Sequence, residues 1–360
     1  MLNVNTREKQ NDMYYTKDGY LDIEKIIEND RSTFIFIVGA RGIGKTFGIL
    51  KYMLDRKKKF IYMRRTQTQV DMIKSEELNP FKSLRTELGN DYALCMKSIN
   101  KNITGVYKAE KNDEGIEKAS GSVLAYIMAL STVSNIRGFD ASDCDFLCYD
   151  EFISERHEKP LTSEGTAFLN AVETIGRNRE LKGQKPLRVI CLSNSSNLAN
   201  PIFTELKLIT ACEKMLNKSK DYIRLPERDV SVYILHDSPI SKRKAETSLY
   251  KLTGEDSDFS QMSLMNNFNQ EYFGQIKSLN LKEYKPLVQV GEICVYKHKS
   301  QRLWYVTDHT SGEPEIYDSS DVELRRFSND YYYLKTAHLN RHVFFESYIQ
   351  QVLFERYLKF

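Results

Sequence analysis

The sequence predicts an α/β fold in which helices cover both faces of a mostly parallel sheet. Two observations predict this class. Apolar runs without alternating polar residues recur through the first two thirds of the 360-residue chain, as expected of strands that are buried on both faces. Segments with helical periodicity separate several of these runs, which is the alternation that builds such a sheet. The chain is long enough for two domains or for one large domain with an appendage.

Seven segments are expected to form the strands of this sheet, at residues 33–39, 60–65, 103–109, 122–130, 145–150, 187–193 and 230–236. Helices are expected at residues 48–55, 66–78 and 166–178. In the last of these helices, Phe168, Val172 and Ile175 recur at helical spacing and would share one face. A first domain is therefore predicted to span residues 1–238.

The pattern changes after residue 238. Residues 239–272 are polar, basic and helix-prone, and we expect a small helical linker or lid there. Residues 273–360 are expected to form a compact α+β domain. This domain would contain a β-hairpin at residues 291–308 and an amphipathic final helix at residues 341–358.

The composition disfavours several classes of protein. The 52 Lys and Arg against 49 Asp and Glu give a net charge of +3, so any surface that binds nucleic acid would have to be local. The six cysteines lack the paired CxxC groups of a structural zinc site, and we expect reduced thiols in the core. No apolar run reaches the roughly 18 residues that a membrane-spanning helix needs, and the polar N-terminus does not resemble a signal peptide. A soluble intracellular protein is expected.

A glycine-rich loop follows the first predicted strand. It fits the pattern GxxxxGK[ST], and its residues are Gly39, Ala40, Arg41, Gly42, Ile43, Gly44, Lys45 and Thr46. Such a loop curls so that its backbone N–H groups and the following helix N-terminus hold phosphate oxygens. Lys45 is expected to bind the β and γ phosphates of ATP, and Thr46 is expected to coordinate Mg²⁺. The alternative is a chance glycine-rich turn, which the strand before the loop and the helix after it disfavour.

Two adjacent acids end the fifth predicted strand. Apolar and aromatic residues at 146–149 precede Asp150 and Glu151. At the carboxyl end of a parallel strand, Asp150 can reach a metal ion beside the glycine-rich loop. Glu151 can polarise a water molecule for attack on the γ-phosphate, which predicts hydrolysis of ATP. A solvated strand end is the alternative. A GTPase is disfavoured because the sequence lacks the guanine-reading NKxD motif.

Further residues could respond to the γ-phosphate. Asn194 follows the predicted strand at 187–193, and it could sense the γ-phosphate if that strand lies beside the one that ends in Asp150. Ordinary turn chemistry is the alternative. In a ring of subunits, an arginine could reach the nucleotide of a neighbour and stabilise developing charge. The candidates are Arg41, Arg64, Arg65, Arg137, Arg177 and Arg179, and each could equally belong to a surface ion pair.

These motifs resemble those of one family. The segments "VGARGIGKT", "FIYMRRT", "YDEFI", "IGRNRE" and "ICLSNSSNLANPIF" follow one another at spacings that resemble the DNA-packaging ATPases of small protein-primed podophages of the Picovirinae type. These ATPases are related to terminase large subunits. The likeness is specific in the first 205 residues and weaker beyond, through "QMSLMNNF", "LWYVTD" and the aromatic last helix.

The resemblance implies a P-loop NTPase that uses ATP and Mg²⁺. In the family, a homopentameric ring docks on the portal of an empty capsid through a structural RNA and drives double-stranded DNA inward. By resemblance, Lys45 and Thr46 belong to the Walker A motif, and Asp150 and Glu151 are the Walker B acid and the catalytic glutamate. Arg177 matches the trans-acting arginine finger, and Arg137 falls where the family has a second trans-acting basic residue. The protein would work in the host cytoplasm, at the portal vertex, and be absent from the mature virion.

The C-terminal domain is expected to be a vestigial RNase H-like fold. Terminase large subunits carry a nuclease whose carboxylates bind two metal ions. In this chain, the first candidate strand of that domain offers only Glu292 at its edge, and Asp308, Asp318 and Asp321 lie in predicted turns. Nuclease activity is therefore not expected, and the domain would dock on the capsid or RNA and hold DNA.

A translocase that moves any sequence must contact DNA phosphates. The candidate basic residues are Lys57, Lys58, Lys59, Lys108, Lys242, Arg243 and Lys244, with a solvated charged face as the alternative. Two other functions stay open. One is a helicase or AAA-type remodelling ATPase that acts on single-stranded nucleic acid or protein. The other is a structural component of the capsid vertex with an inactive nucleotide site.

Overall fold

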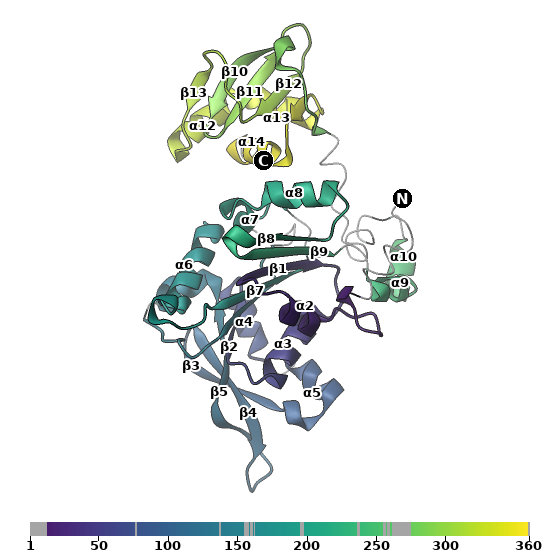
Figure 1. The fold of residues 1–360 in the computed structure, drawn as a ribbon, viewed down its shortest axis with the longest axis vertical. Helices are drawn as coiled ribbons and strands as arrows, with labels where there is room; N and C mark the ends of the chain where they lie inside the picture. The colour runs from purple at the N-terminus through teal and green to yellow at the C-terminus, as the bar shows by residue number, and fades with distance from the viewer. Residues whose placement is uncertain are drawn as a thin grey trace. The chain divides into compact units, whose positions relative to one another are not determined.

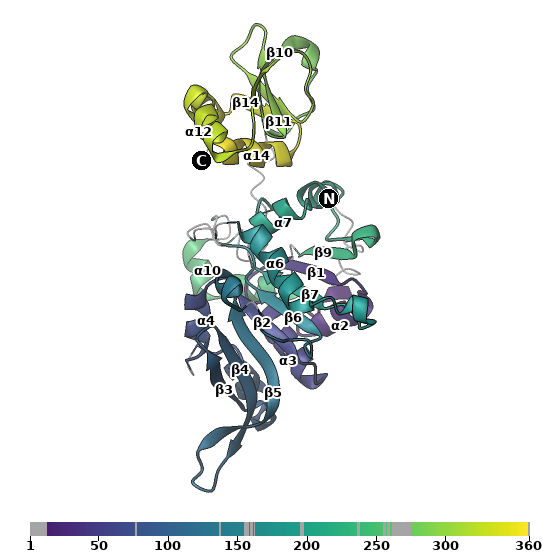
Figure 2. The same ribbon diagram turned by 90° about the vertical axis from the view of Figure 1, so that its left-hand side faces the viewer.

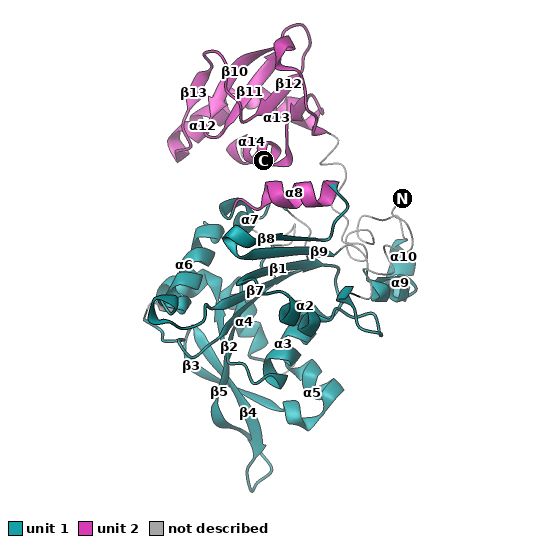
Figure 3. Cartoon of the chain, in the orientation of Figure 1, with its two compact units in different colours: residues 1–206, 218–267 teal, residues 207–217, 268–360 magenta. Residues whose placement is uncertain are grey.

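The computed structural model describes residues 13–75, 78–136, 138–154, 158, 161, 163–194, 198–235, 238–254, 257, 260 and 275–358. The chain divides into two compact units (Figure 3). Unit 1 comprises residues 1–206 and 218–267, and unit 2 comprises residues 207–217 and 268–360. The predicted division at residues 238 and 272 stays a prediction, because residues 261–274 lie outside the described residues.

Unit 1 is built on one sheet of nine strands in the order β3-β4-β5-β2-β6-β7-β1-β9-β8. The strands are β1 (Phe34–Gly39), β2 (Phe60–Arg64), β3 (Leu94–Asn100), β4 (Ile103–Lys111), β5 (Glu117–Ala129), β6 (Phe146–Asp150), β7 (Arg188–Ser193), β8 (Tyr222–Leu225) and β9 (Val230–Leu235). The six strands from β5 to β9 run parallel, and β3, β4 and β8 pair antiparallel at the edges. The predicted mostly parallel sheet is confirmed.

Helices cover both faces of this sheet. Within the described residues, unit 1 contains the helices α2 (Ile23–Asn29), α3 (Lys45–Asp55), α4 (Gln67–Ile73), α5 (Lys82–Leu88), α6 (Glu164–Gly176), α7 (Pro201–Glu205), α9 (Pro239–Ala245) and α10 (Ser248–Thr253). Figures 1 and 2 show α2 and α3 on one side of the sheet and α6 on the other. The predicted helix at 66–78 is shorter in the structure, where α4 ends at Ile73.

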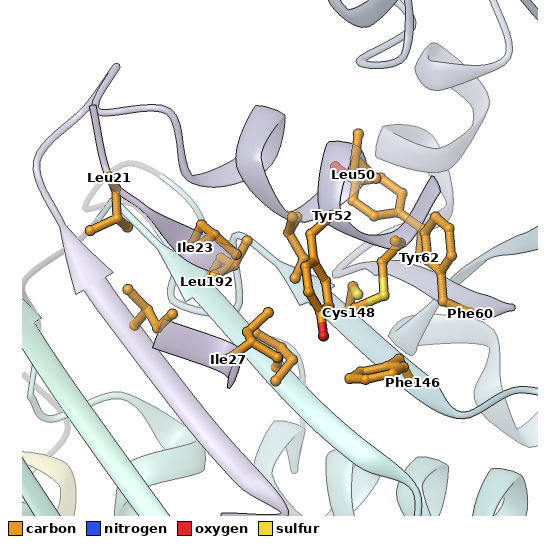
Figure 4. Packing of buried hydrophobic residues seen from close by; sticks show 14 of the residues in the cluster. Leu21, Ile23, Ile27, Leu50, Tyr52, Phe60, Tyr62, Phe146, Cys148 and Leu192 are labelled. Atoms are coloured by element: carbon orange, nitrogen blue, oxygen red, sulfur yellow. The ribbon is translucent and has the colours of Figure 1, made fainter. Parts of the chain in front are cut away.

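The parallel strands are apolar throughout because both of their faces are buried. Ile35 and Ile37 of β1 point into a cluster with α2 and α3, part of which Figure 4 shows. On the other face, the ring of Phe36 lies 5.5 Å from that of Phe152 and 5.3 Å from that of Phe203, between ring centres. Full burial of one such side chain contributes about 1.5–3 kcal/mol, so the strands that end at the glycine-rich loop are held rigidly.

Unit 2 contains a five-stranded sheet in the order β13-β10-β11-β12-β14. Its strands are β10 (Tyr284–Val290), β11 (Ile293–His298), β12 (Trp304–Thr307), β13 (Glu315–Tyr317) and β14 (Val343–Phe345), and its helices are α8 (Ile209–Asn217), α12 (Asp321–Asp330), α13 (Tyr332–Leu339) and α14 (Tyr348–Leu358). Strands β11 and β12 form an antiparallel hairpin, as predicted for residues 291–308. The carboxylate of Glu213 in α8 accepts a hydrogen bond of 3.3 Å from the Tyr348 amide of α14.

The prediction of one helix over residues 341–358 is wrong at its start. Residues Val343–Phe345 form β14, which pairs in parallel with β12, and the helix α14 begins only at Tyr348. The Glu346 amide also donates to the Val306 carbonyl, at 2.9 Å. The edge of the sheet thus supplies backbone partners that the local apolar pattern could not reveal. Among the described residues, no helix is both long and apolar enough to cross a bilayer.

Candidate active site

The glycine-rich loop leads from β1 into the first turn of α3. Gly42 has φ +71°, and Gly44, which caps α3, has φ +92°. L side chains rarely adopt these left-handed conformations, so glycine is required for the loop to curl at both positions. The Leu21 amide donates to the Ile43 carbonyl, at 2.8 Å, and thereby fastens the loop to the N-terminal segment. The loop has the shape that a phosphate-binding loop needs.

Lys45 is buried inside the loop. Its ammonium donates to the carbonyls of Gly39 and Ala40, at 2.7 and 2.8 Å. Burial lowers the pKa of Lys45 to about 7; the carboxylate of Asp150 opposes this shift, and the nearby ammonium of Lys244 adds to it. A phosphate group beside Lys45 would favour the charged ammonium, because an opposite charge stabilises it.

Asp150 stands at the carboxyl end of β6, beside the loop. The hydroxyl of Thr46 donates to its Oδ2 atom at 2.8 Å, and the buried hydroxyl of Tyr62 donates to the same oxygen at 2.7 Å. Burial raises the pKa of Tyr62 well above its ordinary value, so this phenol keeps its proton and acts as a donor. The predicted metal ligands Thr46 and Asp150 are therefore in direct contact. Their hydroxyl and carboxylate oxygens are the hard ligands that Mg²⁺ prefers, and this donor set fits that ion.

Glu151 follows in a backbone conformation with φ +55°. Non-glycine residues adopt this region rarely, and such strain concentrates at functional sites. The guanidinium of Arg64, at the end of β2, pairs with the Glu151 carboxylate and also lies 3.3 Å from Asp150. Only 15% of the Arg64 side chain is exposed. Arg64 thus binds both acids within its own chain, and Glu151 is held by an ion pair in this state.

Strand β7 lies between β6 and β1, with Leu192 opposite Asp150 and Ser193 opposite Val38. Asn194 therefore leaves the sheet between the strand of the glycine-rich loop and the strand of the acids. This is the arrangement on which its predicted contact with the γ-phosphate depends. The contact itself stays a prediction.

The structure separates the candidate arginines into two groups. Arg65 is 1% exposed, and its Nε atom donates to Glu164 at 2.7 Å. Arg179 is buried and donates to the carbonyls of Cys144 and Ser142, both at 2.8 Å. With Arg64, these residues serve contacts inside the chain, which disfavours a role toward a neighbouring subunit.

Arg177 differs from these buried arginines. It caps the C-terminus of α6 with φ +44°, about a third of its side chain is exposed, and its Nη1 atom lies 3.8 Å from Asp140. An ion pair this exposed contributes little, so the guanidinium could leave it at low cost. Arg137 lies outside the described residues. The trans-acting roles of Arg177 and Arg137 stay predictions.

The basic clusters also prove heterogeneous. In the first cluster, Lys57 is exposed and Lys58 half-buried, whereas Lys59 pairs with Asp143. Lys108, Lys242 and Arg243 are exposed. The ammonium of Lys244 instead turns toward the glycine-rich loop, where it donates to the Arg41 carbonyl at 2.5 Å. The DNA contacts, including that of Lys244, stay predictions.

In unit 2, Asp308 lies close to two groups that the sequence did not single out. Asp308, His309 and Glu346 each place one possible ligand atom within 4.8 Å of the others. The Nδ1 atom of His309 lies 3.5 Å from Asp308, and its Nε2 atom lies 3.9 Å from Glu346. Asp308 and His309 are mostly exposed, and such groups are common on surfaces without a metal ion. The prediction that the chain lacks nuclease activity stays a prediction.

The sequence motifs did not predict the contacts that Tyr62 and Arg64 make with the acids, or the contact of Lys244 with the loop. Arg64 and Tyr62 come from β2, the strand beside β6, so the order of strands brings them to Asp150. The one signal in the sequence was an arginine at the end of an apolar strand. Lys244 comes from α9, about 200 residues after the loop, and no local pattern marks its contact.

The fold and the site define a P-loop ATPase: a parallel sheet carries the phosphate-binding loop on one strand and the paired acids on a strand two positions away. The family model of the Podovirus DNA encapsidation protein (Gp16) matches residues 13–311. The chain therefore belongs to this family.

Individual relatives agree with this assignment. The DNA packaging protein of Bacillus phage phi29 is 24% identical, over 95% of this chain and 98% of that protein. The DNA packaging protein of Bacillus phage B103 is 25% identical, over 88% and 94% of the two chains. The solved structure described as the bacteriophage Phi-29 viral genome packaging motor assembly has a TM-score of 0.64 at 18% identity, over 94% of this chain and 99% of that one. That likeness shows the fold.

Proposed function

We propose that this protein is the ATP-driven motor that moves double-stranded viral DNA into an empty capsid through the portal vertex. One observation supports the proposal above all: the match to the encapsidation family spans residues 13–311, which include the glycine-rich loop, both acids and the hairpin of unit 2. The family match thus covers the ATPase site and part of unit 2. The related chain of phage phi29 is itself a DNA packaging protein.

The chemistry follows from the site. ATP would bind with its phosphates on the backbone of the loop and on the Lys45 ammonium, which already sits inside it. Thr46 and Asp150 would hold Mg²⁺, whose positive charge stabilises the phosphates in the transition state when it is bound. Glu151 would orient and deprotonate the attacking water. In the structure, this carboxylate pairs with Arg64.

Arg177 is proposed to act on the nucleotide of a neighbouring subunit in a ring, which we expect to be a pentamer. Its support is the exposed side chain at the end of α6, together with the family resemblance. Mixing tests this role. Arg177→Ala and Glu151→Gln subunits, each inactive alone, should regain part of the ATPase activity in mixed rings, because some interfaces join an intact acid to an intact arginine. No recovery in rings shown to be mixed would contradict action in trans.

The partners follow from the same proposal. They are the portal of the capsid, double-stranded DNA contacted through its phosphates, and a structural packaging RNA that docks the ring. The motor would work in the host cytoplasm and leave the capsid after packaging. Unit 2 would serve docking and DNA binding, without cutting DNA.

Stimulation of the ATPase tests the function. Duplex DNA together with empty capsids should raise ATP turnover, whereas single-stranded DNA alone should not. A helicase or a remodelling ATPase would respond to single strands or to protein without capsids. A structural vertex component would show no turnover under any of these conditions.

A further inference from the structure

The chain returns to the glycine-rich loop after the last parallel strand. Strand β9 pairs in parallel with β1, with Leu235 opposite Gly39, so both strands end at the same place. Helix α9 begins at Pro239, four residues after β9 ends. A Cβ atom on Gly19 would meet Pro239 at 2.9 Å, which shows that α9 packs closely on the N-terminal turn. The helix is therefore held beside the loop.

Lys244, in the last turn of α9, reaches the middle of the loop. Its ammonium donates to the Arg41 carbonyl at 2.5 Å and lies 3.0 Å from the point where a Cβ of Gly42 would stand. It also lies 5.6 Å from the ring centre of Tyr250, a cation–π distance. The ammonium of Lys244 is thus positioned by helix α9, by the Arg41 carbonyl and by the Tyr250 ring. The absence of a side chain on Gly42 leaves the space that it occupies.

Two ammonium groups meet at this loop. The ammonium of Lys45 donates to the carbonyls of Gly39 and Ala40, and the ammonium of Lys244 donates to the next carbonyl, that of Arg41. Beside the loop, the carboxylates of Asp150 and Glu151 both pair with Arg64. An anion bound between the ammonium groups would satisfy both. The terminal phosphate of ATP carries the most negative charge of the nucleotide and suits this place best.

We propose that Lys244 is an ATP-binding residue whose ammonium leaves the Arg41 carbonyl and binds the terminal phosphate of ATP. This inference rests on the proposed ATPase function and adds a contact from outside the P-loop motif. Lys45 and the loop backbone bind the nucleotide whether or not it has a γ-phosphate. Lys244 makes the site prefer ATP over ADP, because only ATP brings a γ-phosphate to its ammonium.

Binding of fluorescent nucleotides to the full chain tests the inference. Lys244→Met should weaken the affinity for a slowly hydrolysed ATP analogue by roughly tenfold to hundredfold, the range for one charge-assisted hydrogen bond, and weaken the affinity for ADP much less. The matched control is Lys251→Met, which removes an exposed lysine from the next helix, α10. The control should bind both nucleotides as the parent does.

The possible results distinguish a failure of the proposed ATPase function from a failure of the inference about Lys244. Failure of the parent chain to bind either nucleotide would contradict the proposed function itself. Parental affinity of Lys244→Met for the ATP analogue would overturn the inference while leaving the function intact. An equal loss for ATP analogue and ADP would also overturn it, because it would show that Lys244 only supports the shape of the loop. A melting temperature measured without nucleotide establishes that the variant is folded.

Discussion

Replacing Arg65 with methionine should destabilise unit 1 strongly, because it breaks a buried ion pair. Arg65 directly follows β2, and Glu164 opens α6; each side chain is 1% exposed. Two guanidinium nitrogens contact the two carboxylate oxygens of Glu164, at 2.7 and 3.3 Å, and a third nitrogen donates to Glu158 at 2.8 Å. Methionine fills a similar volume but leaves a carboxylate in the core without its cation.

The magnitude follows from the burial. Removal of one partner from a buried ion pair costs about 3–5 kcal/mol, since the remaining charge cannot reach water. Glu164 would retain the hydroxyl of Tyr149 at 3.4 Å and the amide of Leu161 at 3.3 Å, which places the expected cost toward the lower end. For a domain of this size, the cost corresponds to a melting temperature lower by roughly 6–20 °C. The double variant Arg65→Met/Glu164→Met should recover most of this loss.

Thermal unfolding followed by circular dichroism measures the effect. The single tryptophan of the chain, Trp304, lies in unit 2 and provides a separate probe of that unit. Arg56→Met is the matched control, because it breaks an exposed pair with Glu24 and should leave the transition in place. A parental transition for Arg65→Met would refute the reasoning, as would a double variant that is no more stable than the single one.

Two further predictions concern the same unit. Arg179→Ala should destabilise the nucleotide-free chain, whereas Arg177→Ala should not, because only Arg179 is buried and donates to backbone carbonyls; equal urea midpoints would contradict this. The stability of the nucleotide-free chain should rise between pH 7 and 9 more than that of Lys45→Met. The pKa of Lys45 falls from 10.5 to about 7 on folding, so in this window the unfolded chain binds the extra proton. Urea midpoints that change equally between pH 7 and 9 for the parent and for Lys45→Met would contradict this prediction.

The parallel strands could be predicted because they are buried on both faces and therefore apolar throughout. Strand β3 was missed, since residues 97–100 are exposed at the edge of the sheet and three of these four residues are polar. Strand β8 was missed for the same kind of reason, because it is short and only half-buried. The sequence predicts a helix where β14 lies, because the three residues of β14 owe their conformation to pairing with β12 and not to a local pattern.

The residues of the site likewise fall into those that the sequence could predict and those that it could not. Lys45, Thr46, Asp150 and Glu151 lie in two short motifs whose chemistry fixes both residue type and spacing, so the sequence predicts them as site residues, and in the structure Thr46 contacts Asp150. Contacts between distant segments could not be identified. The pairing of Arg64 with the two acids depends on β2 lying beside β6, and an isolated arginine could equally have faced solvent. The left-handed backbone conformation of Glu151 likewise could not be predicted from the sequence.

Packaging of DNA by the Glu151→Gln variant tests the central claim most directly. Empty capsids, duplex DNA, ATP and Mg²⁺ are combined with the protein, and the DNA that resists added nuclease is measured beside the affinity for ATP. The parent chain should protect DNA. The variant should bind ATP as tightly as the parent, since Lys45, Thr46 and Asp150 are unchanged, yet protect none, because only water activation is lost. Protection of DNA by the variant at the parental level would contradict the claim that hydrolysis at this site drives packaging.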